Sequence, residues 1–186
     1  MQKKKFTLTQ LIFMALMAAV MCIAGPLAVP IGPVPITLTN LVIYIAVGVL
    51  GTVQGTISYC LYLLLGMVGL PVFSGYAGGL GKLAGPTGGY LIGFIAMALI
   101  GGIVMEVSHR KLIPTLIGWF IGTAVDYLLG TLWFMYIMHT TFMQTMAVCV
   151  FPFIIGDCIK LIAGVMLGRQ LHKILVHAGF IKTAVA

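Results

Sequence analysis

Long apolar runs, separated by short polar breaks or by breaks rich in glycine and proline, dominate the chain. A helix that crosses a membrane needs roughly 20 mostly apolar residues. Six runs suit such helices, and the pattern predicts them over residues 9–25, 38–50, 56–69, 88–107, 113–136 and 152–172. The fold class that we expect is therefore an all-α membrane protein, a bundle of six transmembrane helices.

The breaks between these runs carry their own signals. Residues 26–35 contain four prolines, and proline cannot continue a helix because it lacks a backbone donor and clashes with the preceding turn. Residues 70–87 contain five glycines and are expected to form a loop without a helix. Gly51 and Gly55 mark a tight turn between the second and third helices. The polar break at residues 139–141 precedes a candidate interfacial helix that ends at Val150.

Composition supports a membrane protein. Of the 186 residues, 61% are hydrophobic and only 7% are charged, whereas a soluble domain carries about 25% charged residues. Such a chain leaves no room for a sizeable soluble domain, so residues 1–186 are expected to form a single integral membrane domain. The first apolar run has no clear cleavage site and is expected to stay as a helix. The four cysteines show no metal-ligand spacing and are expected to be small buried apolar residues.

The distribution of charge predicts the orientation of the helices. A net charge of +7 can indicate nucleic acid, but in a membrane protein it more simply reflects the excess of Lys and Arg in cytoplasmic loops. With six helices and both termini inside, eight of the ten basic residues fall on the inner side: Lys3, Lys4, Lys5, Arg110, Lys111, Arg169, Lys173 and Lys182. The loops at 26–37 and 70–87 then both lie outside.

One ionisable pair interrupts the last apolar run. Asp157 and Lys160 are three residues apart, so their side chains share one face of a helix. Ionisable groups are costly in a membrane and usually face a cavity with a function. The other two acids are Glu106, four residues before Arg110 and placed for a surface pair, and Asp126, which lies in a predicted helix core without an assigned role.

Two nucleotide-binding motifs are absent from the glycine-rich segment. A phosphate-binding loop needs Gly-Lys-Ser/Thr at the start of a helix, and a dinucleotide fingerprint needs a preceding strand; neither occurs in residues 66–94. Glycines also permit close approach of the backbone to a ligand. The segment is therefore interpreted as a loop folded over a cavity, the alternative being an external loop without a role.

Four sequence blocks resemble the BioY family, the biotin-binding membrane subunits (S components) of energy-coupling-factor (ECF) vitamin transporters. They are Pro-Ile-Thr-Leu from Pro35, Gly-Leu-Pro-Val-Phe from Gly69, Gly-Pro-Thr-Gly-Gly-Tyr-Leu-Ile-Gly-Phe from Gly85, and Phe-Ile-Ile-Gly-Asp-Cys-Ile-Lys from Phe153. The blocks follow the family's order across nearly the whole chain. The resemblance implies six helices with the vitamin held near the outer face, and it departs where Thr39 and Asn40 stand in place of a Gln.

The resemblance also implies roles for particular residues. Asp157 would accept the ureido N–H groups of biotin, while Lys160 would donate to the ureido carbonyl or pair with Asp157. Lys82 would bind the carboxylate. An apolar wall would be formed by Tyr90, Phe73 and Tyr76. Neutral hydrogen bonds would come from Thr37, Asn40 and Thr87. Ala15 and Ala19 match an Ala-xxx-Ala stripe that docks on the coupling subunit, since small residues four apart let helices approach closely; the alternative is packing within this chain.

The function implied by the resemblance is capture of biotin for ATP-driven uptake across a bacterial plasma (inner) membrane. The chain has no ATP-binding motif, so the partners would be a membrane coupling subunit and ATPase subunits; no cofactor, metal or nucleic acid is expected, and the chain is not expected to be an enzyme. Three alternatives stay open: an S component or stand-alone carrier for another vitamin, an intramembrane enzyme that uses Asp126 and Asp157, and a structural subunit without a ligand.

Overall fold

The computed structural model of the protein describes residues 6–30 and 34–181 and is mostly helical in these ranges. Helices occur in each of the six predicted regions. The elements in chain order are α1 (Leu8–Ala24), β1 (Ala28–Val29), β2 (Ile36–Thr37), α2 (Thr39–Leu50), α3 (Thr52–Met67), α4 (Leu80–Ala84), α5 (Gly88–Val107), α6 (Leu112–Met138), α7 (Phe142–Cys149) and α8 (Ile154–His177).

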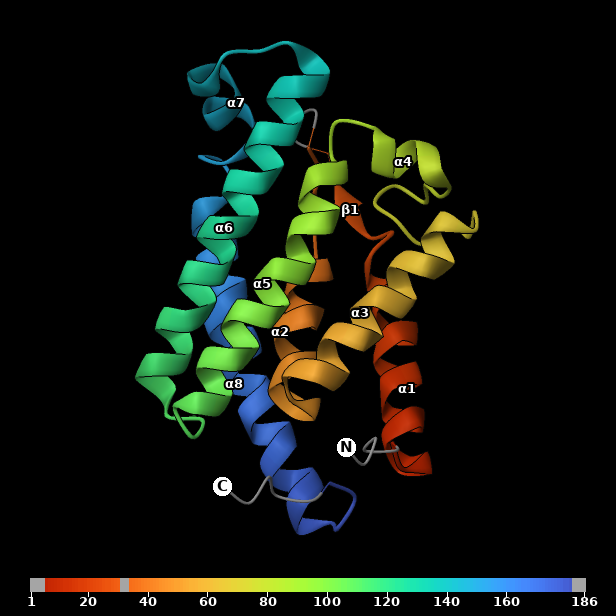
Figure 1. Ribbon diagram of the computed structural model, residues 1–186, viewed down its shortest axis with the longest axis vertical. Helices are drawn as coiled ribbons and strands as arrows, with labels where there is room; N and C mark the ends of the chain where they lie inside the picture. The colour runs from red at the N-terminus through yellow and green to blue at the C-terminus, as the bar shows by residue number, and fades with distance from the viewer. Residues whose placement is uncertain (1–5, 31–33, 182–186) are drawn as a thin grey trace, which may run out of the picture.

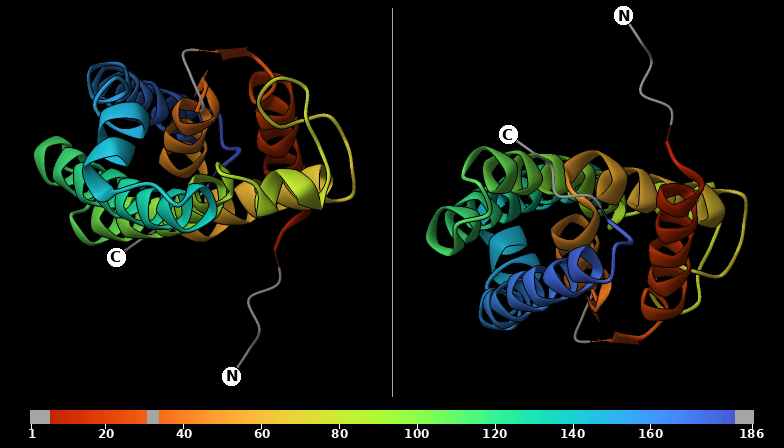
Figure 2. Two further views of the ribbon diagram at one scale, coloured as in Figure 1. Left: turned by 90° about the horizontal axis from the view of Figure 1, so that it is seen from above. Right: turned by 90° about the horizontal axis from the view of Figure 1, so that it is seen from below.

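The long helices form two rows. Helices α3, α5 and α6 lie in one row and α1, α2 and α8 in the other, as the views along the bundle show (Figure 2). Helix α1 begins and α8 ends at the same end of the bundle, whereas β1, α4 and α7 gather at the opposite end (Figure 1). We refer to this opposite end as the loop end.

Glycines set the close packing between neighbouring helices. A Cβ on Gly130 of α6 would lie 2.2 Å from the Tyr90 ring of α5, and a Cβ on Gly101 of α5 would lie 2.4 Å from the Trp119 ring of α6. Between α2 and α8, Gly48 and Gly168 meet directly, with a Cβ on either one 3.1 Å from the Cα of the other. Small residues at such crossings let helices approach closely inside a membrane.

The turn between α2 and α3 differs from the expectation. Gly51 forms it alone, at a φ of +90° that favours glycine. Gly55 lies within α3, where a Cβ would be 2.6 Å from the Cα of Val47, so the predicted start of this helix at residue 56 is wrong. Gly55 is needed for close packing on α2 rather than for a turn.

Side chains from α5 and the α5–α6 connection stabilise this turn. Glu106 accepts a hydrogen bond from the backbone N–H of Thr52 at 2.7 Å, and Arg110 donates to the carbonyl of Gly48 at 2.6 Å. These contacts satisfy backbone groups that have no partner at helix ends. The expected surface pair of Glu106 with Arg110 is therefore wrong: among the described residues, neither forms a salt bridge.

The loop end contains elements that the sequence did not predict. Strands β1 and β2 form a short antiparallel hairpin in which Ala28 faces Thr37. The short helix α4 lies within the region expected to be free of helices. Helix α7 occupies the region of the candidate interfacial helix, and a capping box of Thr141 with Gln144 begins it. These irregular elements cover the loop end of the two rows.

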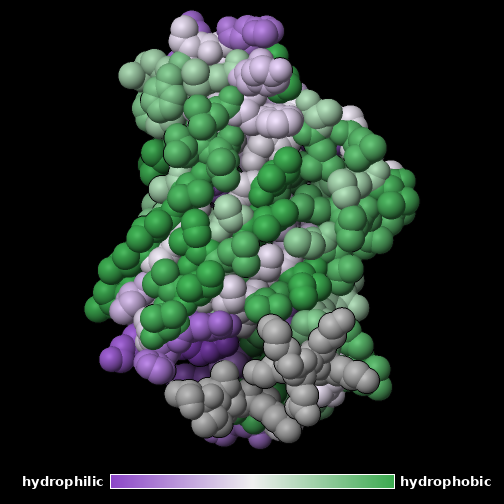
Figure 3. Space-filling view, in the orientation of Figure 1, coloured by the Kyte–Doolittle hydropathy of each residue, from purple (hydrophilic) through white to green (hydrophobic). Residues whose placement is uncertain are grey.

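Length and apolarity identify α5 and α6 as helices that can cross a membrane, and α7 with α8, bent by 54° where they meet, pass the same test only when taken together. Helices α1, α2 and α3 are also apolar but shorter. Apolar side chains cover the middle of the face in Figure 3, with hydrophilic residues near its two ends. On α5, Ile92, Leu99 and Ile103 are exposed on the surface, as expected for contact with lipid. The chain is a helical, multi-pass membrane protein.

Candidate functional site

A cavity lies between the two rows toward the loop end. It contains about 650 Å³ of space between atoms, part of it open to solvent. Residues from β2, α2, α3, α5, α6, α7 and α8 line it together with loop residues: Val34, Pro35, Thr37, Thr39, Asn40, Tyr62, Ser74, Thr87, Tyr90, Leu91, Phe94, Asp126, Tyr127, Cys149, Phe153, Asp157 and Lys160. A concave, largely apolar space with a few convergent polar groups is typical of a small-molecule site.

Asp157 and Lys160 lie on one face of the first turns of α8, as their spacing predicts. Lys160 Nζ is 2.5 Å from Asp157 Oδ1. Asp157 is only 8% exposed, and a buried carboxylate needs hydrogen bonds as well as a counter-charge. Lys160 supplies the counter-charge from α8 itself, while Asn40 of α2 and Tyr127 of α6 donate hydrogen bonds.

All three hydrogens of the Lys160 ammonium have acceptors within the protein. Besides Asp157, Nζ donates to the carbonyl of Thr37 at 3.0 Å and to Asn40 Oδ1 at 3.1 Å. A lysine ammonium offers three donors and no acceptor. In this arrangement, Lys160 ties the end of the β hairpin and the start of α2 to α8 and has no hydrogen left for a ligand.

Asp157 retains capacity to accept a further hydrogen bond. Its Oδ1 accepts from Asn40 Nδ2 at 2.9 Å as well as from Lys160, and its Oδ2 accepts from the Tyr127 hydroxyl at 2.5 Å. A carboxylate has about four acceptor positions over its two oxygens, and three are occupied here. The remaining position is on Oδ2.

The opposite wall, formed by α5 and α6, carries polar groups without partners. Tyr90 is 8% exposed and Asp126 is 2% exposed. Within residues 6–30 and 34–181, neither the Tyr90 hydroxyl nor Asp126 Oδ1 has a hydrogen-bond partner. Buried polar groups almost always have one, but both atoms are enclosed by the protein: Asp126 Oδ1 packs against Gly93 of α5, where a Cβ would lie 2.3 Å from it.

Most of the predicted binding residues line the cavity, namely Asp157, Lys160, Tyr90, Thr37, Asn40 and Thr87, and Asn40 does so as a partner of the charged pair. Phe73 and Lys82 are not among the lining residues. Phe73 is fully buried behind the cavity wall, where its ring packs edge-on against Tyr62 with centroids 5.6 Å apart. Tyr76 is 67% exposed and is not among the lining residues either.

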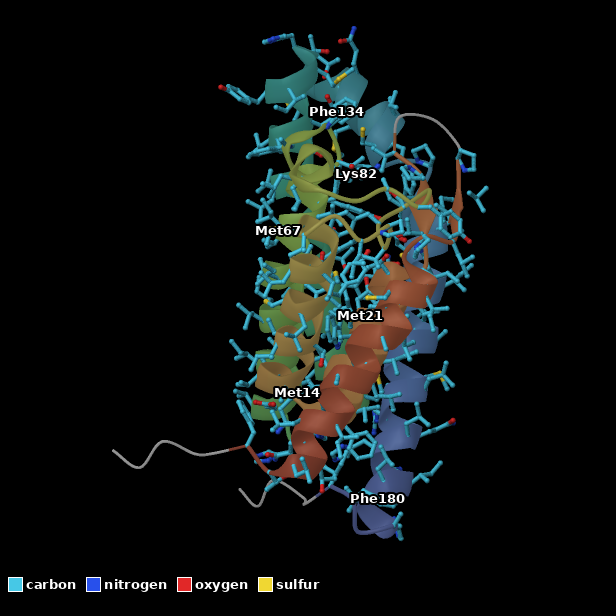
Figure 4. The ribbon with its side chains drawn as sticks, turned by 90° about the vertical axis from the view of Figure 1, so that its right-hand side faces the viewer. Met14, Met21, Met67, Lys82, Phe134 and Phe180 are labelled. Atoms are coloured by element: carbon cyan, nitrogen blue, oxygen red, sulfur yellow. The ribbon has the colours of Figure 1, made fainter. Side chains whose placement is uncertain are left out.

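Lys82 lies in α4, near the loop end where Phe134 also lies and away from Met14 (Figure 4). It is half-buried, and burial lowers the pKa of its ammonium. Trp133 donates from its indole N–H to the carbonyl of Gly85 at 2.9 Å, which holds the end of the α4–α5 connection against α6. This connection brings Thr87 to the cavity.

Sequence reasoning did not assign a role to Tyr127. In the structure, its hydroxyl donates to Asp157. In the sequence alone, a tyrosine in an apolar helix equally suits anchoring at the membrane interface, so it did not indicate a site. Its role depends on how α6 lies relative to α8, which no local pattern reports. Asp126 did stand out in the sequence as an acid in an apolar run, without an assigned partner.

The two alanines of α1 that were predicted to dock on a partner face outward. Ala15 and Ala19 are exposed, whereas Met14, Ala18 and Met21 are buried against the rest of the bundle. Within the described residues, this exposure leaves the Ala15–Ala19 stripe accessible to another helix.

Comparisons with known proteins point to one family. The model of the BioY family matches residues 1–177. Biotin transporter BioY2 of Lactococcus lactis subsp. cremoris is 34% identical over 170 residues, which cover 91% of this chain and 93% of that protein. Biotin transporter BioY of Thermotoga maritima is 33% identical over 173 residues, covering 90% of this chain and 98% of that protein.

A solved structure shares the fold. The S-component for biotin from an ECF-type ABC transporter, known from a crystal structure at 2.1 Å, has a TM-score of 0.83 and 32% sequence identity to this chain. The match covers 91% of this chain and 95% of that one.

Proposed function

The chain belongs to the BioY family, and we propose that it is the biotin-capturing S component of an ECF-type vitamin uptake transporter rather than an enzyme. The observation that carries this proposal is the Asp157 carboxylate, held by three partners at the wall of a largely apolar cavity. Biotin combines a polar ureido ring with an apolar thiophane ring and chain, and this cavity offers matching surfaces.

In the proposed complex, Asp157 accepts a ureido N–H at the open position on Oδ2. A hydrogen bond to an ionised carboxylate is among the stronger contacts available to a neutral ligand. Lys160 then acts as a positioning residue, because its three hydrogens already bind Asp157, Thr37 and Asn40. Within the pair, Asp157 therefore contacts the ligand, and Lys160 holds Asp157 in place.

The rest of biotin would contact the apolar and neutral polar lining. Tyr90 and Phe94 offer apolar surface on α5, while Thr87 lies where α5 begins. We assign the carboxylate of biotin to the loop end, with Lys82 of α4 as its cation. Phe73 supports the site from behind through Tyr62.

We propose that the chain crosses a bacterial inner membrane six times, with α7 and α8 forming the last span and both termini inside. Two observations support this orientation. Helix α1 begins and α8 ends at the same end of the bundle (Figure 1). The described basic residues of the predicted inner cluster lie in the α5–α6 connection, Arg110 and Lys111, and in the last turns of α8, Arg169 and Lys173. Lys3, Lys4, Lys5 and Lys182 lie outside the described residues. The loop end, with its cavity, then faces outward.

We further propose that the outward-facing alanines of α1 dock on a membrane coupling subunit that works with ATPase subunits. Support comes from the exposure of Ala15 and Ala19 and from the likeness to an S-component of an ECF-type transporter.

The experiment is a calorimetric titration of the purified chain in detergent with biotin, riboflavin and thiamine. We expect saturable binding of biotin alone, and a weaker signal for Asp157→Asn. The Ile103→Ala variant, altered on the exposed surface of α5, is the matched control. Saturable binding of riboflavin or thiamine with none of biotin would instead identify a carrier for another vitamin.

A further inference from the structure

A second groove lies at the end of the bundle opposite the loop end, between the start of α6 and the last turns of α8. It contains about 510 Å³ of space between atoms, part of it open to solvent. Hydrophilic residues gather at this end of the molecule, near the α5–α6 connection (Figure 3). The groove is lined by Leu112, Met166, Arg169, Gln170 and Lys173.

The groove has an excess of positive charge. Arg169 and Lys173 line it, and within the described ranges the single salt bridge is the one at the biotin cavity, so neither cation has an acidic partner. Burial lowers the pKa of the nearby Arg110 guanidinium, the charge of Glu106 raises this pKa and the charge of Arg169 lowers it. The two arginines therefore lie close enough to repel each other, and an anion in the groove would relieve that repulsion.

An apolar stripe continues from the groove along the same face of α8. Ile159, Ile162 and Met166 are spaced by three and four residues and are all exposed, and Arg169 and Lys173 continue this helical spacing. The ten positions from Ile159 to Arg169 correspond to about 15 Å of helix, half of the roughly 30 Å hydrocarbon core of a bilayer. The stripe thus has the length of one leaflet, and the cations lie where the headgroups of that leaflet would be.

We propose that this groove binds an anionic phospholipid of the inner leaflet, with its phosphate at Arg169 and Lys173 and one acyl chain along the apolar stripe. The guanidinium can donate two parallel hydrogen bonds to a phosphate, and the ammonium adds a point charge. Basic pockets between membrane helices on the cytoplasmic side suit such headgroups.

The apolar stripe favours a lipid over a free phosphate ion, because an ion would use the two cations and leave the stripe without a partner. The inference does not depend on biotin. It uses only the proposed orientation, which places this end of the bundle inside.

The test titrates the purified full chain in detergent with phosphatidylglycerol and with zwitterionic phosphatidylcholine, and native mass spectrometry measures the bound lipid. We expect phosphatidylglycerol to bind more tightly. In the double variant Arg169→Gln with Lys173→Gln, its Kd should rise about 10- to 30-fold, the range for two basic residues near a headgroup, while the Kd of phosphatidylcholine stays the same. Inorganic phosphate should not displace phosphatidylglycerol.

The matched control is Lys4→Gln with Lys5→Gln, which removes the same charge from the N-terminal segment and should keep the lipid preference. Gln170→Glu, which adds a negative charge at an exposed position of the groove, should also weaken binding of phosphatidylglycerol and serves if the groove variant does not fold. Biotin binding should be unchanged in all three variants, since none of these residues lines the biotin cavity.

Four outcomes would overturn the inference. Equal affinity of the unchanged protein for both lipids would exclude an anionic preference. Equal loss in the groove variant and the control would indicate net charge instead of a site. Displacement by inorganic phosphate would indicate an anion site without a place for an acyl chain. Unchanged lipid binding of the groove variant, with loss of co-purification with the coupling subunit, would identify the groove as a protein-docking surface.

Discussion

Replacing Lys160 by methionine removes the cation from the pair while keeping a long side chain. Asp157 then loses its counter-charge, and Thr37 and Asn40 each lose a donor. Removing one partner of a buried ion pair costs about 3–5 kcal/mol of folding free energy. The side chains of Lys160 and Asp157 keep 14% and 11% exposure at the cavity, and water screens them in part. We therefore expect a loss of about 2–3 kcal/mol.

The double variant Asp157→Asn with Lys160→Met separates stability from recognition. It removes both charges, so no uncompensated carboxylate remains, and we expect it to recover most of the stability that Lys160→Met loses. It also replaces the carboxylate that accepts the ureido N–H. A hydrogen bond to a charged group is worth about 1.5–3 kcal/mol, so we expect the Kd for biotin to rise about 10- to 150-fold.

The assay combines denaturant unfolding in detergent micelles with calorimetric titration of biotin. The unchanged protein, Lys160→Met and the double variant are compared under one condition, with Ile103→Met as the control for an added methionine. The reasoning is refuted if Lys160→Met is as stable as the unchanged protein, or if the double variant binds biotin with unchanged affinity.

Two further predictions concern the contact of Lys82 with the carboxylate of biotin and the docking surface on α1. Lys82→Gln should weaken binding of biotin by about 2- to 5-fold, in the range of a partly exposed charge contact, and should leave binding of biotin methyl ester unchanged in the same titration. Equal loss for both ligands would argue against a carboxylate contact. Ala15→Trp should retain biotin binding but lose co-purification with the coupling subunit, whereas Ile103→Trp on α5 should retain both; co-purification of Ala15→Trp would contradict docking through α1.

The apolar pattern predicted the long helices because their lengths and their burial in lipid depend on local sequence. The region of α5 was predicted from residue 88 to 107, and its helix has these bounds. Glycine was less informative. Gly51 lies in a turn with positive φ, but Gly55 packs against Val47 within a helix. The sequence does not distinguish these two uses, because the second depends on which helix lies opposite.

The candidate site was predictable where its chemistry is unusual for a membrane helix. Asp157 and Lys160 stood out as charges in an apolar run, and they meet as their spacing requires. Tyr127 did not stand out, because its contact joins α6 to α8 across 30 residues of chain. Phe73 belongs to a block that resembles the family, but it supports Tyr62 instead of lining the cavity. Contacts of this kind depend on tertiary packing.

A structure with biotin bound tests the central claim most directly, through the distance between the ureido nitrogens and the carboxylate of Asp157. The proposed recognition predicts one ureido nitrogen at about 2.7–3.2 Å from Asp157 Oδ2, with Lys160 still bound to Asp157, Thr37 and Asn40. A bound biotin whose two ureido nitrogens both lie beyond hydrogen-bond distance of the Asp157 carboxylate would contradict this claim.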